Sequence, residues 1–548
     1  MHVLFVVPRF AAPGQFYSYP IGLAYVYAFL KRHGVSVSCL NLCHESCAST
    51  HASLEQEFAK VHVDMVCTGG ISTYWEQIND ILMSAKRISR DVITVVGGAI
   101  VTADPETALA HLPIDYGVTG EGEYTLVELL ETLQTEGGRP ENVKGLAFRS
   151  PNGQLVLTGG RGEIKNLDAL PIPEYQDFGF RDWTENAKNR PGSEVCDPLG
   201  EVRFAAVIGS RSCPFSCTFC YHPLGKKYRQ RSLDHIFGEI DYLTTTYDIN
   251  MIHFVDELFC ADQRRMLAFA ERIRPYGIGW GCNLRVSQVS LELLETLVSS
   301  GLMCVGMGIE SMNDDVLKSM KKHTTKAMNI TALETIRQAR LYSSSNIILG
   351  DPADTTETVN ETITWWKSNP VYGITLGLIR AVPDGPIYRD ALQEGIIKDR
   401  HAHIKNLPLV NLSKMSDKQY YSLVLKVHWW NLMHTYVASG TLIGTRRLEE
   451  CHGDKHFYEI QLRCPVCGSE QTNRKFLDIP TPNVRIICTH CSTSFKVPQK
   501  QAFPGDYSLV ATARYALPRL VVYVMTRFSF FRKYRYMVKQ MLDRFVRL

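Results

Sequence analysis

Short apolar runs alternate with helix-patterned segments over the first 140 residues. Four runs have the length of buried strands: residues 3–7, 35–42, 65–70 and 92–97. The segment that begins at Pro20 repeats its apolar side chains at helical spacing. Strands that alternate with helices form a parallel sheet with helices on both faces. We therefore predict a doubly wound, Rossmann-like α/β domain over residues 1–140.

After this domain the alternation of strand and helix patterns stops. Residues 145–150 and 154–158 flank an Asn-Gly turn and predict a hairpin. Residues 167–173 contain two prolines and cannot continue a helix or a strand. We assign residues 141–200 to this hairpin and a linker.

The alternation resumes at Phe204. Six further runs have strand length and are separated by helical patterns: residues 204–209, 251–255, 279–282, 304–308, 345–349 and 374–379. A complete eight-stranded barrel usually needs about 250 residues, more than this segment offers. We therefore predict a partial (β/α)6 barrel of the TIM type over residues 201–400. A helical extension is predicted over residues 401–463.

The composition fits a chain of several folded domains. The 548 residues are 45% hydrophobic, which supports buried cores, and 21% charged, which excludes a disordered or collagenous chain. The net charge of +3 indicates no particular partner. No segment has the roughly 18–20 uninterrupted apolar residues that span a bilayer. The first residues lack a basic stretch and a cleavage signal, so we expect a cytoplasmic protein.

Seven of the 16 cysteines fall into two groups with metal-ligand spacing. The first group, Cys213, Cys217 and Cys220, follows the first predicted barrel strand. Its spacing lets one short loop present three thiolates to three irons of a 4Fe–4S cluster, which leaves the fourth iron open. The alternative is a zinc site with His222 as the fourth ligand.

The three-cysteine loop, in which Phe219 precedes Cys220, resembles the radical S-adenosylmethionine (SAM) superfamily. In that superfamily the cluster donates one electron to SAM, and a 5′-deoxyadenosyl radical results. The resemblance implies an external electron donor of the flavodoxin or ferredoxin type. It also implies SAM contacts at the ends of the later strands. The residues that match are Asp256 and Glu257 for the amino group, Arg285 for the carboxylate, Glu310 and Ser311 for the ribose, and Ile348 beside the adenine.

A doubly wound domain in front of such a barrel resembles the cobalamin-dependent branch of the superfamily. The residues that carry this likeness, and that would bind cobalamin, are Tyr19, Pro20, Gly22, Ser72, Gly97, Gly98, Gly120, Glu121 and Gly122. Ser72 and the glycine pair have the spacing of a tail-binding pair in cobalamin domains. The histidine motif that ligates cobalt in many such domains is absent from residues 8–17. The lower face of the cobalt would then be left to water or to a residue other than histidine.

A group formed by Cys39, Cys43, His44 and Cys47 lies near the end of the second predicted strand. We interpret it as a core thiol and loop residues, with a second metal site as the alternative.

The second cysteine group consists of two Cys-x-x-Cys pairs, Cys464 with Cys467 and Cys488 with Cys491. Paired knuckles at this spacing predict a four-thiolate zinc ribbon, which we place over residues 464–500. Four protein ligands leave no open position, so we expect a structural or docking role.

The remaining residues, 501–548, predict a basic amphipathic helix. We expect it to pack on its own protein, with peripheral contact to the inner membrane face as the alternative. We do not expect nucleic-acid binding.

Together these features predict a cobalamin-dependent radical SAM enzyme. The commonest chemistry of the branch is class B methyl transfer, in which methylcobalamin donates a methyl group to an unactivated carbon of an organic substrate. The sequence does not identify that substrate. Three alternatives stay open: oxidative cyclisation or ring rearrangement of the anaerobic cyclase type, methylthio transfer, and a non-catalytic cobalamin or redox sensor.

Overall fold

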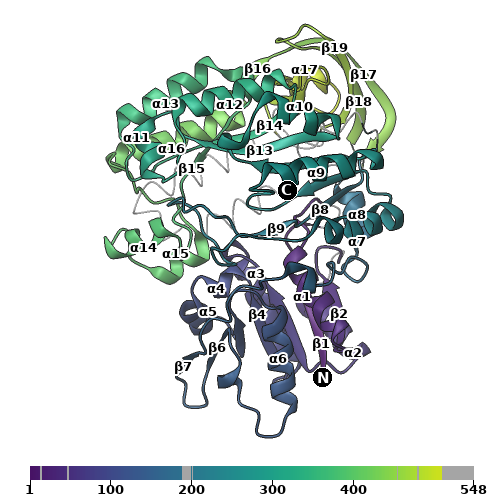
Figure 1. Ribbon diagram of the computed structural model, residues 1–548, viewed down its shortest axis with the longest axis vertical. Coiled ribbons are helices and arrows are strands. Elements are labelled where there is room, and N and C mark those ends of the chain that lie inside the picture. The colour runs from purple at the N-terminus through teal and green to yellow at the C-terminus, as the bar shows by residue number, and fades with distance from the viewer. Residues whose placement is uncertain are drawn as a thin grey trace.

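A computed structural model gives the fold of this chain. It describes residues 1–12, 15–45, 49–187, 199, 201–452, 455–477, 481–508 and 512. An N-terminal α/β domain lies on one side of a six-stranded parallel sheet, and a smaller group of strands from the last part of the chain lies on the opposite side (Figure 1). Of the predicted basic tail, only residues 501–508 and 512 are described, and the rest lies outside the described residues. No helix in the described part is long and apolar enough to cross a membrane.

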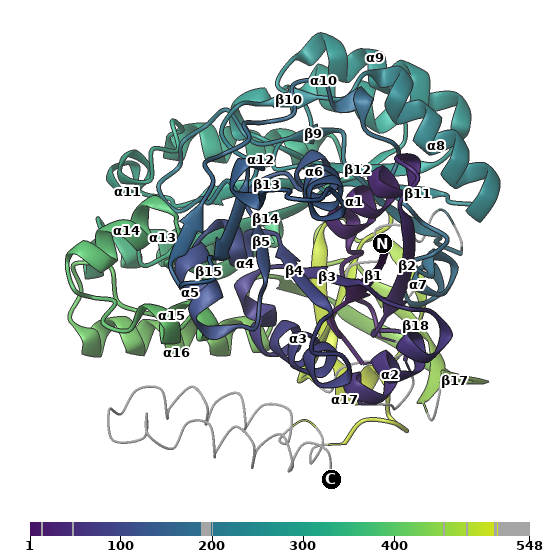
Figure 2. The same cartoon turned by 90° about the horizontal axis from the view of Figure 1, so that it is seen from below.

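The N-terminal domain is built on a seven-stranded sheet of order β2-β1-β3-β4-β5-β6-β7. Its strands are β1 (His2–Val7), β2 (Ser36–Asn41), β3 (Met65–Gly69), β4 (Ile93–Gly97), β5 (Tyr116–Val118), β6 (Leu146–Arg149) and β7 (Leu155–Leu157). Its helices are α1 (Ile21–Arg32), α2 (Thr50–Lys60), α3 (Trp75–Ile88), α4 (Ala99–Thr102), α5 (Pro105–His111) and α6 (Glu123–Gln134). Helices α1 and α6 pack on one face and α2 and α3 on the other (Figure 2). The predicted doubly wound domain is confirmed.

Apolar burial explains this sheet. Val3 to Val7 of β1 are at most 1% exposed, because parallel strands in the centre of such a sheet are covered on both faces. β6 and β7 form the predicted hairpin, and β6 also pairs antiparallel with β5. The hairpin therefore extends the N-terminal sheet.

A linker with the 3-10 turn η3 (Leu167–Ala169) and helix α7 (Phe180–Ala187) leads to the second sheet. Its order is β15-β14-β13-β12-β11-β8, and every pair is parallel. The strands are β8 (Phe204–Val207), β11 (Met251–Phe254), β12 (Gly279–Leu284), β13 (Leu302–Glu310), β14 (Tyr342–Leu349) and β15 (Thr375–Leu378). The helices between them are α8 (Leu233–Tyr247), α9 (Gln263–Ile273), α10 (Leu291–Ser299), α11 (Asp314–Ser319), α12 (Lys326–Gln338) and α13 (Thr356–Ser368). All six predicted strands are present, and they form an open, partial barrel.

The next segment is only partly helical. Helices α14 (Pro386–Gln393), α15 (Arg400–Asn406) and α16 (Asp417–Leu432) agree with the prediction. The prediction is wrong from Thr441 to Arg463, where β17 (Thr441–His452) and β18 (Lys455–Arg463) form an antiparallel pair. Tyr458, Ile460 and Leu462 alternate with more exposed residues, which is the period of a strand with one buried face.

These strands belong to the same module as the second cysteine group. β18 pairs with β19 (Glu470–Phe476), while β16 (Ala438–Ser439), β20 (Asn483–Ile487) and β21 (Ser494–Pro498) form a second small sheet. Helix α17 (Gln499–Ala502) closes the module. We call residues 438–508 the four-cysteine module. It is larger than a ribbon over 464–500, because its apolar core includes β18 as well as β20 and β21.

Candidate active site

The three-cysteine loop lies between two short strands, β9 (Ser210–Arg211) and β10 (Arg229–Gln230), just after β8. Cys213, Cys217 and Cys220 all line one cavity of about 650 Å³. Glu257, Asn283, Arg285 and Glu310 line the same cavity from the carboxyl ends of the next strands. The cysteine loop therefore sits where parallel α/β sheets bind their ligands.

The donor geometry of the loop fits a cluster better than a single ion. Within the described ranges, the four ligand cysteines of the four-cysteine module are the only group of three or more ligating side chains whose donor atoms lie within 4.8 Å of one another. The three loop cysteines do not all converge this closely, although Cys217 and Cys220 share a hydrogen bond. Thiolates that each bind a separate iron of a cubane need wider spacing than ligands of one zinc ion.

The surroundings favour the thiolate form at one of the three cysteines, Cys217, whereas burial raises the pKa of Cys213. The pKa of Cys217 is lowered to about 6, chiefly by a hydrogen bond from Cys220 and then by the nearby charges of Lys322 and Arg285. The same hydrogen bond, with burial, raises the pKa of Cys220. Thiolates are the form of cysteine that binds metal, so Cys217 is prepared for a cluster before one arrives.

His222 does not complete a zinc site. Its Nδ1 lies 2.7 Å from a carboxylate oxygen of Glu257, and this hydrogen bond raises the pKa of the imidazole. The Nε2 atom is buried at the cavity and has no hydrogen-bond partner among the described residues. An unsatisfied buried nitrogen of this kind is a ready contact for a polar ligand.

Arg285 leaves the end of β12 and lies directly against the cysteine loop. Its guanidinium carbon is 3.4 Å from the centre of the Phe215 ring, and the group donates a hydrogen bond of 2.6 Å to the carbonyl of Lys322. The backbone N–H of Arg285 donates to Gln288 in a capping box that fixes the turn after β12. This arginine is held in place beside the loop.

Glu310 and Lys322 form a buried ion pair in the cavity wall. Their charged atoms are 2.8 Å apart and each side chain is about a tenth exposed. Glu310 has a φ of +63° where the register of β13 and β14 shifts. Gly308 leaves the space for this pair, because a Cβ there would collide with both charged groups. Lys322 is a site residue that the sequence prediction did not include.

Of the remaining predicted SAM contacts, one lines the cavity and the others do not. Phe219 lines the cavity. The buried carboxylate of Asp256 accepts backbone hydrogen bonds from Gly209 and Ser210, so it ties β11 to the end of β8. Burial raises the pKa of this carboxyl group. Ser311 is buried against Thr362, and Ile348 packs in the core behind the cavity.

The glycines of the N-terminal sheet make a close approach between β3 and β4. Gly98 has a φ of +84°, and a Cβ on it would lie 2.8 Å from the carbonyl oxygen of Gly70. A Cβ on Gly69 would likewise meet the carbonyl of Gly97. Ser72, which is buried, begins the 3-10 turn η1 (Ser72–Tyr74) at the same edge. Glycine backbone that packs this closely at the carboxyl ends of two central strands is typical of the edge at which α/β sheets bind a cofactor.

Tyr19 and Pro20 directly precede helix α1, which begins at Ile21. The Tyr19 hydroxyl donates a 2.7 Å hydrogen bond to the carbonyl of Glu174 in the linker, and its ring stacks on Tyr175. Pro20 is the N-cap of α1, and Gly22 in the first turn has open space at its Cβ position.

Two further features lie at the ends of the strands of this sheet. Gly120 and Gly122 flank Glu121 after β5. Phe10, which follows β1, and Tyr74 are neighbours, with their ring centres 4.3 Å apart.

Glu121 joins the two domains. One of its oxygens lies 2.6 Å from Arg211 and the other 2.7 Å from Arg229, while Glu123 lies 2.7 Å from Arg211. All four side chains are less than 9% exposed. Arg211 and Arg229 are on β9 and β10, which frame the cysteine loop, and Arg229 also bonds to the carbonyl of Leu224 within it. We call Glu121, Glu123, Arg211 and Arg229 the interdomain clamp.

The paired cysteines of the four-cysteine module converge as one set of four possible metal ligands. Cys464 lies 3.8 Å from Cys491, and Cys467 lies 3.6 Å from Cys488, measured between sulfur atoms. A hydrogen bond from Cys491 helps to lower the pKa of Cys488 to about 4. Four close sulfurs with an ionised member suit zinc or iron in a closed structural site.

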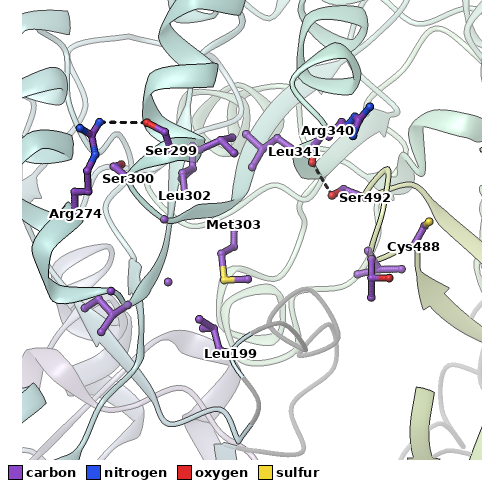
Figure 3. Close-up of a pocket in the computed structure, with 17 residues that line it drawn as sticks. Leu199, Arg274, Ser299, Ser300, Leu302, Met303, Arg340, Leu341, Cys488 and Ser492 are labelled. Carbon is purple, nitrogen blue, oxygen red and sulfur yellow. Dashed lines mark hydrogen bonds between the residues drawn. The ribbon is translucent and has the colours of Figure 1, made fainter. Parts of the chain in front are cut away.

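A second cavity, of about 450 Å³, lies between this module and the opposite ends of the barrel strands. Cys488 and Ser492 reach it from the module, and Ser300, Leu302 and Leu341 from the barrel (Figure 3). The Ser492 hydroxyl donates a 2.6 Å hydrogen bond to the carbonyl of Arg340. None of the three loop cysteines reaches this cavity.

The cysteines near β2 have no metal-site geometry in the described part of the chain. Cys43 is buried, and its sulfur accepts a hydrogen bond from the Phe10 backbone and donates one to the carbonyl of Pro8. His44 contacts the Tyr17 hydroxyl at 2.9 Å. Cys47 lies outside the described residues. The described members are thus loop and core side chains.

Comparison with known proteins gives this geometry a family. The model of the B12 binding domain matches residues 11–130, and that of the radical SAM superfamily matches residues 207–365. An uncharacterized methyltransferase, PH0819, from Pyrococcus horikoshii is 27% identical over 74% of this chain and 88% of its own length. The anaerobic magnesium-protoporphyrin IX monomethyl ester cyclase of Cereibacter sphaeroides is 28% identical over 66% of this chain, which spans only 59% of that protein.

A solved structure agrees with the fold. The radical SAM methyltransferase TsrM from Kitasatospora setae, with tryptophan and a SAM analogue bound, superposes with a TM-score of 0.59 at 18% identity. The match covers 72% of this chain and 77% of TsrM. The two matched domains and the three-cysteine loop define a radical SAM enzyme. More particularly, this chain belongs to the cobalamin-dependent radical SAM enzymes, whose cofactors are a 4Fe–4S cluster, SAM and cobalamin. Such an enzyme needs an electron donor and an organic substrate.

Proposed function

We propose that this enzyme transfers a methyl group from methylcobalamin to an unactivated carbon of an organic substrate. The interdomain clamp carries the proposal. Reductive cleavage of SAM alone requires the barrel and its cluster, but here Glu121 of the B12-binding domain is bonded to both strands that frame the cysteine loop. Such a connection is useful when the methyl donor and the radical must meet at one substrate carbon.

Different residues bind the cluster, SAM and cobalamin. When bound, the cluster and SAM supply a 5′-deoxyadenosyl radical, and cobalamin supplies the methyl group. Cys213, Cys217 and Cys220 hold the cluster. We assign Arg285 to the carboxylate of SAM, and the Glu310–Lys322 pair to its ribose. The glycine edge at Gly70 and Gly98 receives the cobalamin tail, beside Ser72.

One experiment tests the proposal directly. The chain is reconstituted anaerobically with iron, sulfide, cobalamin and SAM, and formation of 5′-deoxyadenosine is measured with a flavodoxin or ferredoxin as the electron donor. Metabolites from cells with and without the protein are then compared by mass spectrometry. A product heavier by one methylene unit supports methyl transfer. The proposal fails if no compound gains a methyl group although SAM is cleaved.

The second candidate is oxidative cyclisation, because the cyclase of Cereibacter sphaeroides has nearly the same percentage identity to this chain as the methyltransferase relative, over a shorter part of it. A product that loses hydrogens or gains oxygen, without a methyl group, would favour it. Methylthio transfer would need a second cluster in the first domain. A total near four irons per chain, rather than eight, would exclude it.

The cellular setting is part of the proposal. Clusters and free thiols of this kind persist in a reducing compartment, which supports a cytoplasmic enzyme. Peripheral membrane contact rests on the basic tail, most of which lies outside the described residues. Co-sedimentation with anionic liposomes, with and without the residues after Pro504, tests it. Equal binding by both chains would exclude a role for the tail.

A further inference from the structure

The catalytic cavity extends far beyond the cysteine loop. Every second residue of β14 lines the cavity from the start of the strand to its middle: Tyr342, Ser344 and Asn346. Four residues of strand span about 13 Å. On the neighbouring strand β13, the lining residues Cys304, Gly306 and Gly308 carry small side chains or none, which leaves space beside β14. The space therefore runs down the inside of the barrel, away from the cluster.

The four-cysteine module reaches the far end of this cavity through one residue, Arg485. Arg485 of β20 is a lining residue together with the loop cysteines, although the loop follows β8 of the barrel and Arg485 belongs to the four-cysteine module. Its guanidinium lies 5.9 Å from the centre of the Tyr342 ring. Cys488, a member of the metal-ligand set, follows Arg485 by three residues. The metal site and the strand that carries the arginine are thus one rigid unit.

Several contacts fix this unit to the barrel. The Ser492 hydroxyl bonds to the carbonyl of Arg340, next to the start of β14. Lys496 on β21 donates to the carbonyls of Met433 and His434 at the end of α16. The position of Arg485 in the cavity is therefore set by the fold on both sides.

The two ends of the cavity differ in charge. Its described carboxylates, Glu257 and Glu310, both lie at the cysteine end, where they pair with His222 and Lys322. At the other end the lining includes the guanidinium of Arg485 beside the ring of Tyr342. The hydroxyl and amide groups of Ser344 and Asn346 lie between the two ends.

We propose that the four-cysteine module is the floor of the catalytic cavity and that its Arg485 binds an anionic group, a carboxylate or a phosphate, at the end of the substrate remote from the cluster. The inference rests on the proposed function of the cavity and adds the class of substrate. A guanidinium presents a planar fork of donors that matches either anion, and it keeps its charge at every physiological pH. The substrate would lie along β14, with the reacting carbon toward the cluster.

Anion binding tests this without knowledge of the substrate. The anaerobically reconstituted full-length enzyme, saturated with SAM so that the SAM carboxylate site is filled, is dialysed to equilibrium against radiolabelled hexanoate or inorganic phosphate. Hexanamide is the neutral probe. We compare the wild type with Arg485→Gln, Arg485→Lys and the matched control Arg474→Gln. Arg474 is an exposed arginine of the same module that pairs with Glu450 and does not line the cavity.

We expect one saturable anion site per chain and at least about tenfold weaker binding in Arg485→Gln, with part of the affinity kept by Arg485→Lys. Arg474→Gln should bind like the wild type. Preference for hexanoate or for phosphate identifies the group. Equal anion affinity in Arg485→Gln, equal retention of hexanamide, or no saturable site in the wild type would overturn the inference. Zinc and iron contents of each variant check that the module and the loop are intact.

The outcomes also separate this inference from the proposed function. If the wild type binds the anion through Arg485 but forms no methylated product, only the proposed function fails. If methylated product forms and Arg485→Gln binds anions normally, only the inference about Arg485 fails.

Discussion

The two cysteine groups of this chain are surrounded in opposite ways. The three loop cysteines line a cavity of about 650 Å³ and lie near Arg285 and Lys322. The ligand sulfurs of the four-cysteine module converge within 4.8 Å, and Cys464 and Cys488 are buried in an apolar core with Ile460 and Phe495. Three ligands leave one metal position for chemistry, whereas four ligands fill the coordination sphere. The number of ligands and the polarity of the surroundings therefore point to the same division between a reactive and a structural centre.

Each group also faces a different neighbour. The loop is bonded through the interdomain clamp to the B12-binding domain, at the carboxyl ends of the barrel strands. The four-cysteine module covers the other ends of those strands. The comparison predicts that damage to one group leaves the metal of the other in place.

The largest effect is expected from Cys217→Ala. Loss of one of three thiolates should abolish the cluster and the formation of 5′-deoxyadenosine, because no spare ligand lies within the set. The zinc content should stay unchanged. Iron and zinc analysis with an assay of SAM cleavage measures both. The control is Cys282→Ala, a buried thiol of β12 outside the cavity lining. Full SAM cleavage by Cys217→Ala would refute the role of the loop.

Cys488→Ser should have the converse effect. Structural zinc sites contribute about 10–16 kcal/mol to the folding of zinc-finger peptides, so we expect loss of the metal and unfolding of the module. Hydrogen exchange should rise in β18, β20 and β21. The iron content should stay near four per chain, and 5′-deoxyadenosine should still form. Parallel loss of iron would mean that the two centres are not independent.

The interdomain clamp offers the next test. Glu121→Gln leaves two buried arginines without their shared carboxylate, and breaking a buried pair in this way costs about 3–5 kcal/mol. We expect a lower denaturation midpoint. We also expect more 5′-deoxyadenosine per methylated product, because the loop is less firmly tied to the methyl donor. Glu131→Gln, on the exposed side of α6, is the control. An unchanged ratio of the two products would show that the clamp only stabilises the fold.

The sequence predicted the parts of this architecture that depend on local signals. The six barrel strands follow from apolar runs, and both cysteine groups follow from their spacing. The helical prediction failed at β17 and β18 because the buried face of β18 exists only against the rest of the module. The clamp could not be predicted either, since Glu121 and Arg229 are 108 residues apart and meet only after the domains pack. Arg485 reaches the cavity for the same reason.

Lys322 is the site residue that the sequence prediction most clearly missed. Its substitution is expected to have the smallest effect of those predicted. Lys322 follows helix α11 beside Lys321, and nothing local distinguishes the two lysines, but only Lys322 is buried. It pairs with Glu310 and lies over the Phe219 ring. We expect Lys322→Gln to weaken SAM binding about tenfold, the effect of one charge-assisted hydrogen bond. Lys321→Gln should bind SAM normally. Equilibrium dialysis with labelled SAM measures the affinity, and the iron content separates a weaker SAM site from a damaged cluster. Unchanged affinity in Lys322→Gln would confine this lysine to holding Glu310 in the wall.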